Sequence, residues 1–152
     1  MRRFFSLGIG CVLLVSCGQE TVSMHSLQGD WDAKRIVEFP IDVKDAGTAK
    51  NIIFVVRNNN SYPYSNIRFF STIEKVGAKK STVDTLNYSM AKPNGEWKGS
   101  GFGDTKEILF QYKTNYIFPE NGKYVIKVKQ AMRNDKLVGI EDFGVKIEQV
   151  QP

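Results

Sequence analysis

The sequence predicts an all-β fold, an antiparallel β-sandwich with either immunoglobulin-like or jelly-roll-like topology. Apolar and polar residues alternate along several separate segments, which is the pattern of strands that bury one face. Glycine, proline and asparagine clusters separate these segments, and no long window carries an apolar stripe at helical spacing. The Cys-Trp-Cys pattern of true immunoglobulin domains is absent, so the sequence leaves both topologies open.

The first sixteen residues have the features of a lipoprotein signal peptide. Arg2 and Arg3 precede an apolar stretch over residues 4–15, which is shorter than the ~20 residues that a membrane-spanning helix needs. The following Leu14-Val15-Ser16-Cys17 resembles the lipobox of bacterial lipoproteins, in which the cysteine becomes the acylated N-terminus. We therefore expect a signal peptide over residues 1–16 and a membrane anchor of diacylglycerol and N-acyl groups on Cys17.

Removal of the signal leaves 136 of the 152 residues, enough for one domain with one core. The stretch after Cys17 is polar and small, which predicts a lipidated tether over residues 17–29 and a single β-sandwich domain over residues 30–152. The loss of Arg2 and Arg3 lowers the formal net charge from +5 to +3.

Five alternating segments and one continuous apolar segment make up the predicted domain. The alternating segments lie at residues 37–43, 67–74, 107–112, 124–129 and 143–148. Their pattern is typical of antiparallel sheets with one wetted side. Pro40 places its strand at a sheet edge or a bulge, because proline donates no backbone hydrogen bond. Residues 52–56 are apolar throughout, which predicts a central strand covered on both faces.

Few side chains of the mature chain suit catalysis. Cys11 leaves with the signal, Cys17 carries lipid, and His25 is the single histidine. These counts exclude a Ser-His-Asp or Cys-His triad and a multi-histidine zinc site from the domain. We predict no enzymatic activity, no catalytic residue, no cofactor and no metal. No basic tract suggests nucleic acid, because the nearest candidate, Lys75 with Lys79 and Lys80, is expected at a solvated hairpin end.

Two loop segments invite a ligand-binding interpretation. Residues 99–104 are glycine-rich but lack the spacing of a phosphate-binding loop, and a strand instead of a helix follows them. Residues 58–66 are rich in side-chain oxygens but contain no carboxylate, so turn capping is favoured over calcium binding. Tyr62 and Tyr64 flank Pro63 in this second segment and are suited to contact a partner.

Two further hypotheses stay open from the residues alone. One is a carboxylate-based hydrolase, which needs two facing acids. Its candidate acids are Asp84, Glu96, Asp104 and Glu107. The other is a glycan- or ligand-binding module with an aromatic platform, for which the candidates are Tyr62, Trp97 and Phe102.

Several blocks of the sequence resemble the GldH family, the gliding-motility lipoproteins of the Bacteroidetes. They are residues 57–67 with Tyr-Pro-Tyr-Ser-Asn, 84–86, 90–97, 101–104, 118–124, 130–133 with Gln-Ala-Met-Arg, and 139–145. The resemblance implies a lipid-anchored envelope protein of the gliding apparatus, which overlaps with type IX secretion. It implies no enzymatic activity, cofactor or catalytic residue.

The leading hypothesis is therefore a non-catalytic assembly or stabilising component that acts through contacts with other gliding and secretion proteins. Tyr62, Tyr64 and Arg133 are its candidate contact residues, and no small-molecule substrate is expected. Only one acid, Glu20, closely follows Cys17. Surface-exported lipoproteins of this phylum tend to carry an acidic cluster there, so we expect an outer-membrane protein that faces the periplasm.

Overall fold

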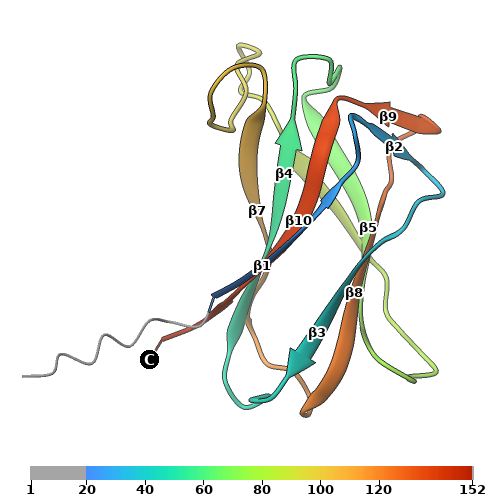
Figure 1. The fold of residues 1–152 in the computed structure, drawn as a ribbon, viewed down its shortest axis with the longest axis vertical. Coiled ribbons are helices and arrows are strands. Elements are labelled where there is room, and N and C mark those ends of the chain that lie inside the picture. The colour runs from blue at the N-terminus through green and yellow to red at the C-terminus, as the bar shows by residue number, and fades with distance from the viewer. Residues whose placement is uncertain (1–19, 152) are drawn as a thin grey trace, which may run out of the picture.

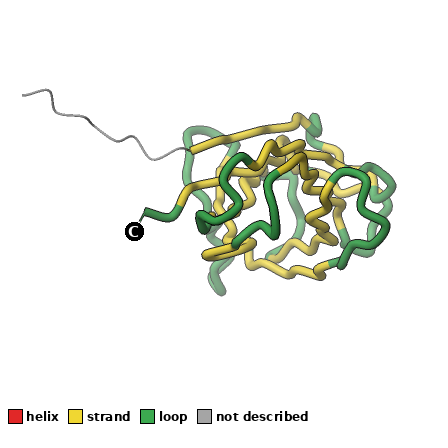
Figure 2. The backbone as a smooth tube through the Cα atoms, turned by 90° about the horizontal axis from the view of Figure 1, so that it is seen from below, coloured by secondary structure: helices red, strands yellow, loops and turns green. Residues whose placement is uncertain are grey.

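The computed structural model describes residues 20–151, which form ten β-strands joined by turns and loops (Figure 1). Figure 2 shows the same residues from below, built of strands and loops throughout. All strand pairs are antiparallel, so the predicted all-β sandwich is confirmed. The described residues contain no helix able to cross a membrane. The predicted signal peptide and Cys17 lie outside them.

Two four-stranded sheets and one small ribbon make up the fold. The first sheet has the order β1 (Glu20–Ser26), β10 (Ile140–Gln149), β4 (Lys50–Asn58) and β7 (Lys106–Tyr116). The second has the order β3 (Val37–Val43), β8 (Gly122–Gln130), β5 (Asn66–Lys75) and β6 (Asp84–Ser89). The ribbon pairs β2 (Asp30–Asp32) with β9 (Lys136–Val138).

Strand positions within the sheets follow the sequence pattern. The continuous apolar segment is the middle of β4, which lies between β10 and β7 and is buried from Ile52 to Val56. The strand with Pro40 is β3, which pairs only with β8 and is therefore an edge strand, as predicted. The five alternating segments all form strands, and most of their apolar residues are buried or half-buried, with Phe70 and Leu109 exposed on the outer faces.

The tether predicted over residues 17–29 is wrong from Glu20 onward. Residues 20–26 form β1, which pairs along its whole length with β10. The next residue, Leu27, is completely buried in the core. An edge strand needs only backbone hydrogen bonds to one neighbour, so β1 can be polar and exposed and still belong to the sheet. The polar composition of this segment therefore concealed a strand.

One lateral side of the sandwich is closed by polar contacts between β6 and β7. The Tyr88 hydroxyl donates a hydrogen bond to the Gln111 carbonyl at 3.0 Å. The Tyr112 hydroxyl donates one to Asp84 Oδ2 at 2.8 Å, and Lys113 Nζ lies 2.8 Å from the same oxygen. Burial opposes ionisation of Asp84, but these two partners outweigh it and hold the pKa of the carboxyl below its ordinary value.

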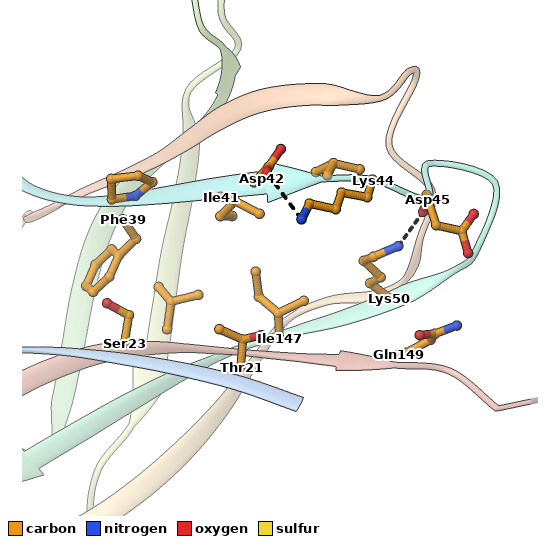
Figure 3. Close-up of a pocket in the computed structure, with 13 residues that line it drawn as sticks. Thr21, Ser23, Phe39, Ile41, Asp42, Lys44, Asp45, Lys50, Ile147 and Gln149 are labelled. Atoms are coloured by element: carbon orange, nitrogen blue, oxygen red, sulfur yellow. Dashed lines mark hydrogen bonds and ion pairs between the residues drawn. The ribbon is translucent and has the colours of Figure 1, made fainter. Parts of the chain in front are cut away.

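The other lateral side, between β1 and β3, is closed along only part of its length. His25 Nε2 donates a hydrogen bond to the Glu38 carbonyl at 3.1 Å, and Arg35 Nη2 donates one to the Ser26 carbonyl at 3.0 Å. Beyond these contacts a cavity of about 360 Å³ opens, where Ile41 and Ile147 face each other (Figure 3). Lys50 lies on its rim and donates to the Asp45 carbonyl at 2.6 Å (Figure 3).

The strands run between two ends that differ in construction. We call one the loop end, which comprises the β4–β5 loop (residues 59–65), the β6–β7 connection (residues 90–105) and the β9–β10 turn. It lies at the top of Figure 1. We call the other the turn end, which comprises residues 44–49, 76–83 and 117–121. β1 begins in the lower half of the molecule and runs toward the loop end (Figure 1).

The loop end is locked together by backbone hydrogen bonds around Gly139. Its carbonyl accepts a hydrogen bond from the Asn59 N–H at 2.9 Å, and its own N–H donates to the Gly29 carbonyl at 2.8 Å. A Cβ atom at Gly139 would lie 2.6 Å from Tyr62 Cα and would overlap the Tyr62 nitrogen. The φ of Gly139 is +86°, in the left-handed region. Only glycine fits this position.

Replacing Asp84 with asparagine is expected to destabilise the protein in a pH-dependent way. The lowered pKa means that the ionised carboxyl stabilises the fold above its ordinary value of 3.8, and that this contribution disappears as the pH falls through the lowered pKa. Asp84→Asn should therefore lower the free energy of unfolding by roughly 1 kcal/mol at neutral pH and by much less well below that value. Urea unfolding of both proteins at neutral pH and at a pH well below 3.8 measures the two losses of stability. An equal loss at the two pH values would contradict a role for the ionised carboxyl.

Gly139→Ala is expected to lower the free energy of unfolding by roughly 3 kcal/mol or more, because backbone strain and overlap with Tyr62 add together. Gly77→Ala is the matched control. Gly77 has the same φ of +86° but nothing within 4 Å of an added Cβ, so only the strain of about 1 kcal/mol applies. Similar losses for the two variants in denaturant unfolding would show that the overlap is relieved at no cost.

Candidate functional site

The loop end gathers most of the segments that the sequence analysis singled out. The oxygen-rich segment forms the β4–β5 loop, and the glycine-rich segment lies in the β6–β7 connection. Turn capping by asparagine is confirmed, because Asn59 Oδ1 accepts a hydrogen bond from the Ser61 N–H at 2.8 Å. The loop end is therefore the candidate functional site.

Tyr62 supports the loop end from inside. Its side chain is only 3% exposed, and its hydroxyl donates a hydrogen bond to the Asn66 carbonyl at 2.6 Å. Burial raises the pKa of this hydroxyl well above its ordinary value, so Tyr62 stays a neutral donor. The structure thus corrects its predicted role, because the ring cannot meet a partner directly.

Tyr64 and Arg133 lie nearer the surface. Tyr64 is half-buried, and its ring makes an edge contact with Tyr62 at a centroid distance of 5.8 Å. Arg133 is exposed on the turn between β8 and β9, at the same end of the sandwich. Both residues are accessible at the loop end, on separate segments.

The most exposed aromatic side chain of the described residues is Phe102, which is completely accessible to solvent. It lies in the β6–β7 connection between Gly101 and Gly103. A Cβ atom at Gly101 would lie 2.6 Å from the Thr105 carbonyl oxygen, so the chain passes too close to itself for a larger residue. Phe102 is therefore the one large side chain in the Gly101–Gly103 segment.

The backbone around Phe102 is held in place. Lys106 Nζ donates hydrogen bonds to the carbonyls of Gly101 and Gly103 at 2.9 and 3.0 Å. Ser100 and Glu107 exchange backbone hydrogen bonds of 2.9 and 2.8 Å at the base of the loop. These contacts fix the backbone that carries the exposed ring, which lowers the entropy that a partner would have to remove on binding.

A short polar chain joins the Phe102 loop to its neighbours. Asn60 Nδ2 donates to Asp104 Oδ1 at 3.1 Å, and Asn60 Oδ1 accepts from Trp97 Nε1 at 3.3 Å. The Trp97 ring packs against Tyr62 at a centroid distance of 6.1 Å. Tyr62, Trp97 and Phe102 therefore do not form the flat exposed platform that a glycan-binding module would use, since only Phe102 is fully exposed.

The four acids proposed for a hydrolase occupy separate environments. Asp84 is held by Lys113 between β6 and β7, and Glu107 accepts from Arg57 Nε at 2.8 Å. The other two lie in the β6–β7 connection, where Asp104 meets Asn60 and Glu96 meets Lys92 at 3.0 Å. Each acid thus has its own partner, which is not the arrangement of a glycosidase pair. Among residues 20–151 no cluster of three or more metal-ligating side chains occurs.

Sequence reasoning placed Phe102 in the alternative glycan platform and missed its role as a lone exposed ring. The available signal was its position between two glycines. A ring flanked by glycines has no neighbouring side chains to pack against, so it projects from the backbone alone.

Comparisons with solved structures show only distant likeness. Dimeric latent PorU of Porphyromonas gingivalis aligns with a TM-score of 0.40 and 9% identity, over 86% of this chain and 13% of that one. Infectious bursal disease virus strain Gx aligns with a TM-score of 0.36 and 10% identity, over 97% of this chain and 37% of that one.

Comparisons of sequence find much more similar proteins than the structural comparisons do. The family model described as GldH lipoprotein matches residues 20–147. The gliding motility lipoprotein GldH homolog of Christiangramia forsetii is 40% identical, over 97% of this chain and 98% of its own length. The gliding motility lipoprotein GldH of Flavobacterium johnsoniae is 35% identical, over 93% of this chain and 92% of its own length. The matches extend over nearly the whole domain, and this chain belongs to the GldH lipoprotein family.

Proposed function

We propose that this gliding motility lipoprotein is a non-catalytic component of the gliding and type IX secretion machinery, acylated at Cys17 and tethered to the outer membrane on its periplasmic side. It assembles or stabilises the machinery by binding other protein components. Membership of a lipoprotein family supports the lipid anchor and a place in the cell envelope. The protein contacts are proposed from the loop end.

The exposed Phe102 ring is the observation that carries the proposal. A fully exposed phenylalanine leaves roughly 1.5–3 kcal/mol of hydrophobic burial unused in the free protein. Because hydrogen bonds already order its loop, a partner with an apolar pocket recovers this energy at little entropic cost. Aromatic anchors of this kind dominate the energetics of many protein interfaces.

Tyr64 and Arg133 are proposed as further contact residues at the same end of the sandwich. Both are accessible, and aromatic and arginine side chains are the residues most enriched at interfaces. Tyr62 enters the proposal as a support of the loop, in place of the direct contact predicted from sequence.

Phe102→Ala is expected to impair colony spreading and type IX secretion while leaving the amount of the protein in membranes unchanged, because no core contact is lost. The matched control is Phe70→Ala. Phe70 is 38% exposed on β5 and lies on a different surface, so its removal should leave both phenotypes intact. Spreading assays, secretion assays and immunoblots of the complemented deletion strain measure these effects. Normal spreading and secretion with Phe102→Ala would refute the contact role of the ring.

Cys17→Ala is expected to move the protein from the membrane fraction to the soluble fraction, because acylation of this sulfur supplies the anchor. Fractionation of cells that express each form measures the change, and Ser23→Ala, at an exposed position outside the lipobox, serves as the control. A variant that still partitions fully with membranes would contradict the lipid anchor at this position.

A further inference from the structure

Because β1 begins at Glu20, the domain starts very close to the residue that carries the lipid. Only residues 18 and 19 separate Cys17 from Glu20, the first residue of β1. Three consecutive peptide steps span at most about 11 Å, even when fully extended. A lipid on Cys17 therefore holds the first residue of the sheet within about 11 Å of the acylated residue, and the domain does not swing on a long linker.

The start of β1 lies on the side of the turn end. Glu20 pairs with Glu148 near the end of β10, and the Val150 N–H donates to the Ala49 carbonyl of the β3–β4 turn at 2.9 Å. The strand then runs away toward Leu27 and the loop end. The surface nearest to the anchor is consequently the turn end.

The turn end displays apolar side chains that the fold does not use. Val76 is 62% exposed on the β5–β6 turn, and Ile117 is 60% exposed after β7. The two turns are tied to each other, since the Val76 N–H donates to the Lys123 carbonyl at 2.8 Å and Lys75 Nζ lies 2.6 Å from Glu120 Oε1. The segments that carry Val76 and Ile117 therefore lie at the same end of the sandwich.

Exposed lysines lie at the same end as these apolar residues. The exposed lysines of this end are Lys44, Lys79, Lys80 and Lys123. Lys79 and Lys80 form no ion pair within residues 20–151, and Lys44 reaches Asp42 only at 3.9 Å. The negative side chains of these turns are Asp45 and Glu120, and Glu120 is already paired with Lys75. Within the three turns Lys44, Lys79 and Lys80 outnumber Asp45 and Glu120 by one. Lys123 of β8 lies opposite Asp42 of β3, so the positive excess of the turn end rests on Lys79 and Lys80.

We propose that the turn end lies on the bilayer surface, with Val76 and Ile117 in the interfacial region and the lysines against anionic lipid headgroups. The inference rests on the lipid anchor at Cys17 proposed above. Exposed apolar residues with lysines at the same end suit a bilayer of anionic lipids, since the apolar side chains enter the interface while the ammonium groups stay among the phosphates. The short link to Cys17 brings this surface to the headgroups.

The same geometry sets the position of Phe102. β4 and β7 have nine and eleven residues, and a strand rises about 3.3 Å per residue. The loop end therefore lies on the order of 30 Å from the turn end, beyond the lipid headgroups. In this orientation Phe102 faces away from the membrane that holds the anchor.

The test uses the full-length acylated protein in vesicles, and the lack of a free cysteine in the mature sequence allows site-specific labelling. Cys11 leaves with the signal and acylation occupies Cys17, so a single introduced cysteine carries a unique label. Ile117→Cys and Val76→Cys are labelled with an environment-sensitive fluorophore, and Phe102→Cys is the matched control. The vesicles contain phosphatidylcholine alone or with roughly a third phosphatidylglycerol.

Labels at positions 117 and 76 are expected to be blue-shifted and at least about threefold less accessible to aqueous iodide than the label at position 102, more so on anionic vesicles. Adding Lys79→Glu and Lys80→Glu should reduce this protection, whereas Lys34→Glu with Lys98→Glu, which alters exposed lysines near the other end, should not.

Equal iodide accessibility at positions 117, 76 and 102 of the acylated protein would overturn the inference and leave the anchor intact. Mass spectrometry of the membrane-extracted protein separates the two proposals. A mature N-terminus without acyl groups on Cys17 would overturn both the anchor and the orientation that depends on it.

Discussion

The packing of Phe143 joins all three layers of the molecule. Its ring lies 5.2 Å from Trp31 of the ribbon, 5.2 Å from Phe54 of its own sheet, and 5.1 Å from Phe69 of the opposite sheet. Aromatic pairs of this kind add about 0.5–1.5 kcal/mol each beyond the burial of their area. Burial of Phe143 also sets which face of β10 turns inward, because a slip by one residue would expose it. The register shifts between Ile140 and Asp142, and Gly139, which carries the lock around Tyr62, lies just beyond this irregularity.

The two ends of the sandwich differ in how they are built and in which side chains they expose. The loop end is held by backbone hydrogen bonds among distant segments, so its exposed ring sits on an ordered surface. The turn end consists of short turns whose exposed side chains are mostly apolar residues and lysines. In the proposed orientation these two chemistries face a protein partner and a bilayer respectively. Neither task needs a catalytic group, which agrees with a domain that has no free thiol and one histidine, His25, engaged with a backbone carbonyl.

Alternation of apolar and polar residues predicted the sandwich, the continuous apolar run predicted the central position of β4, and Pro40 predicted an edge or a bulge for its strand. These strands bury one or both faces, so their sequences carry the signal. The polar strand β1 could not be found in this way, because its stability comes from backbone pairing with β10 and from Leu27 at its end. The ribbon of β2 and β9 was also missed, since each strand has only three residues and no period can appear.

At the candidate site, too, sequence patterns alone could not predict which single side chains are exposed. Composition identified the tyrosines around Pro63 as unusual, but whether a loop tyrosine faces outward depends on a contact from far along the chain, here the turn at Gly139. Phe102 escapes this difficulty because the glycines on both sides remove every local packing partner. Its exposure therefore follows from local sequence, whereas its rigidity comes from Lys106 and Asn60 and needs the folded structure. An exposed ring is suited to be a binding anchor only when both conditions hold, and the fold meets both at the loop end, which the proposed orientation places farthest from the lipid.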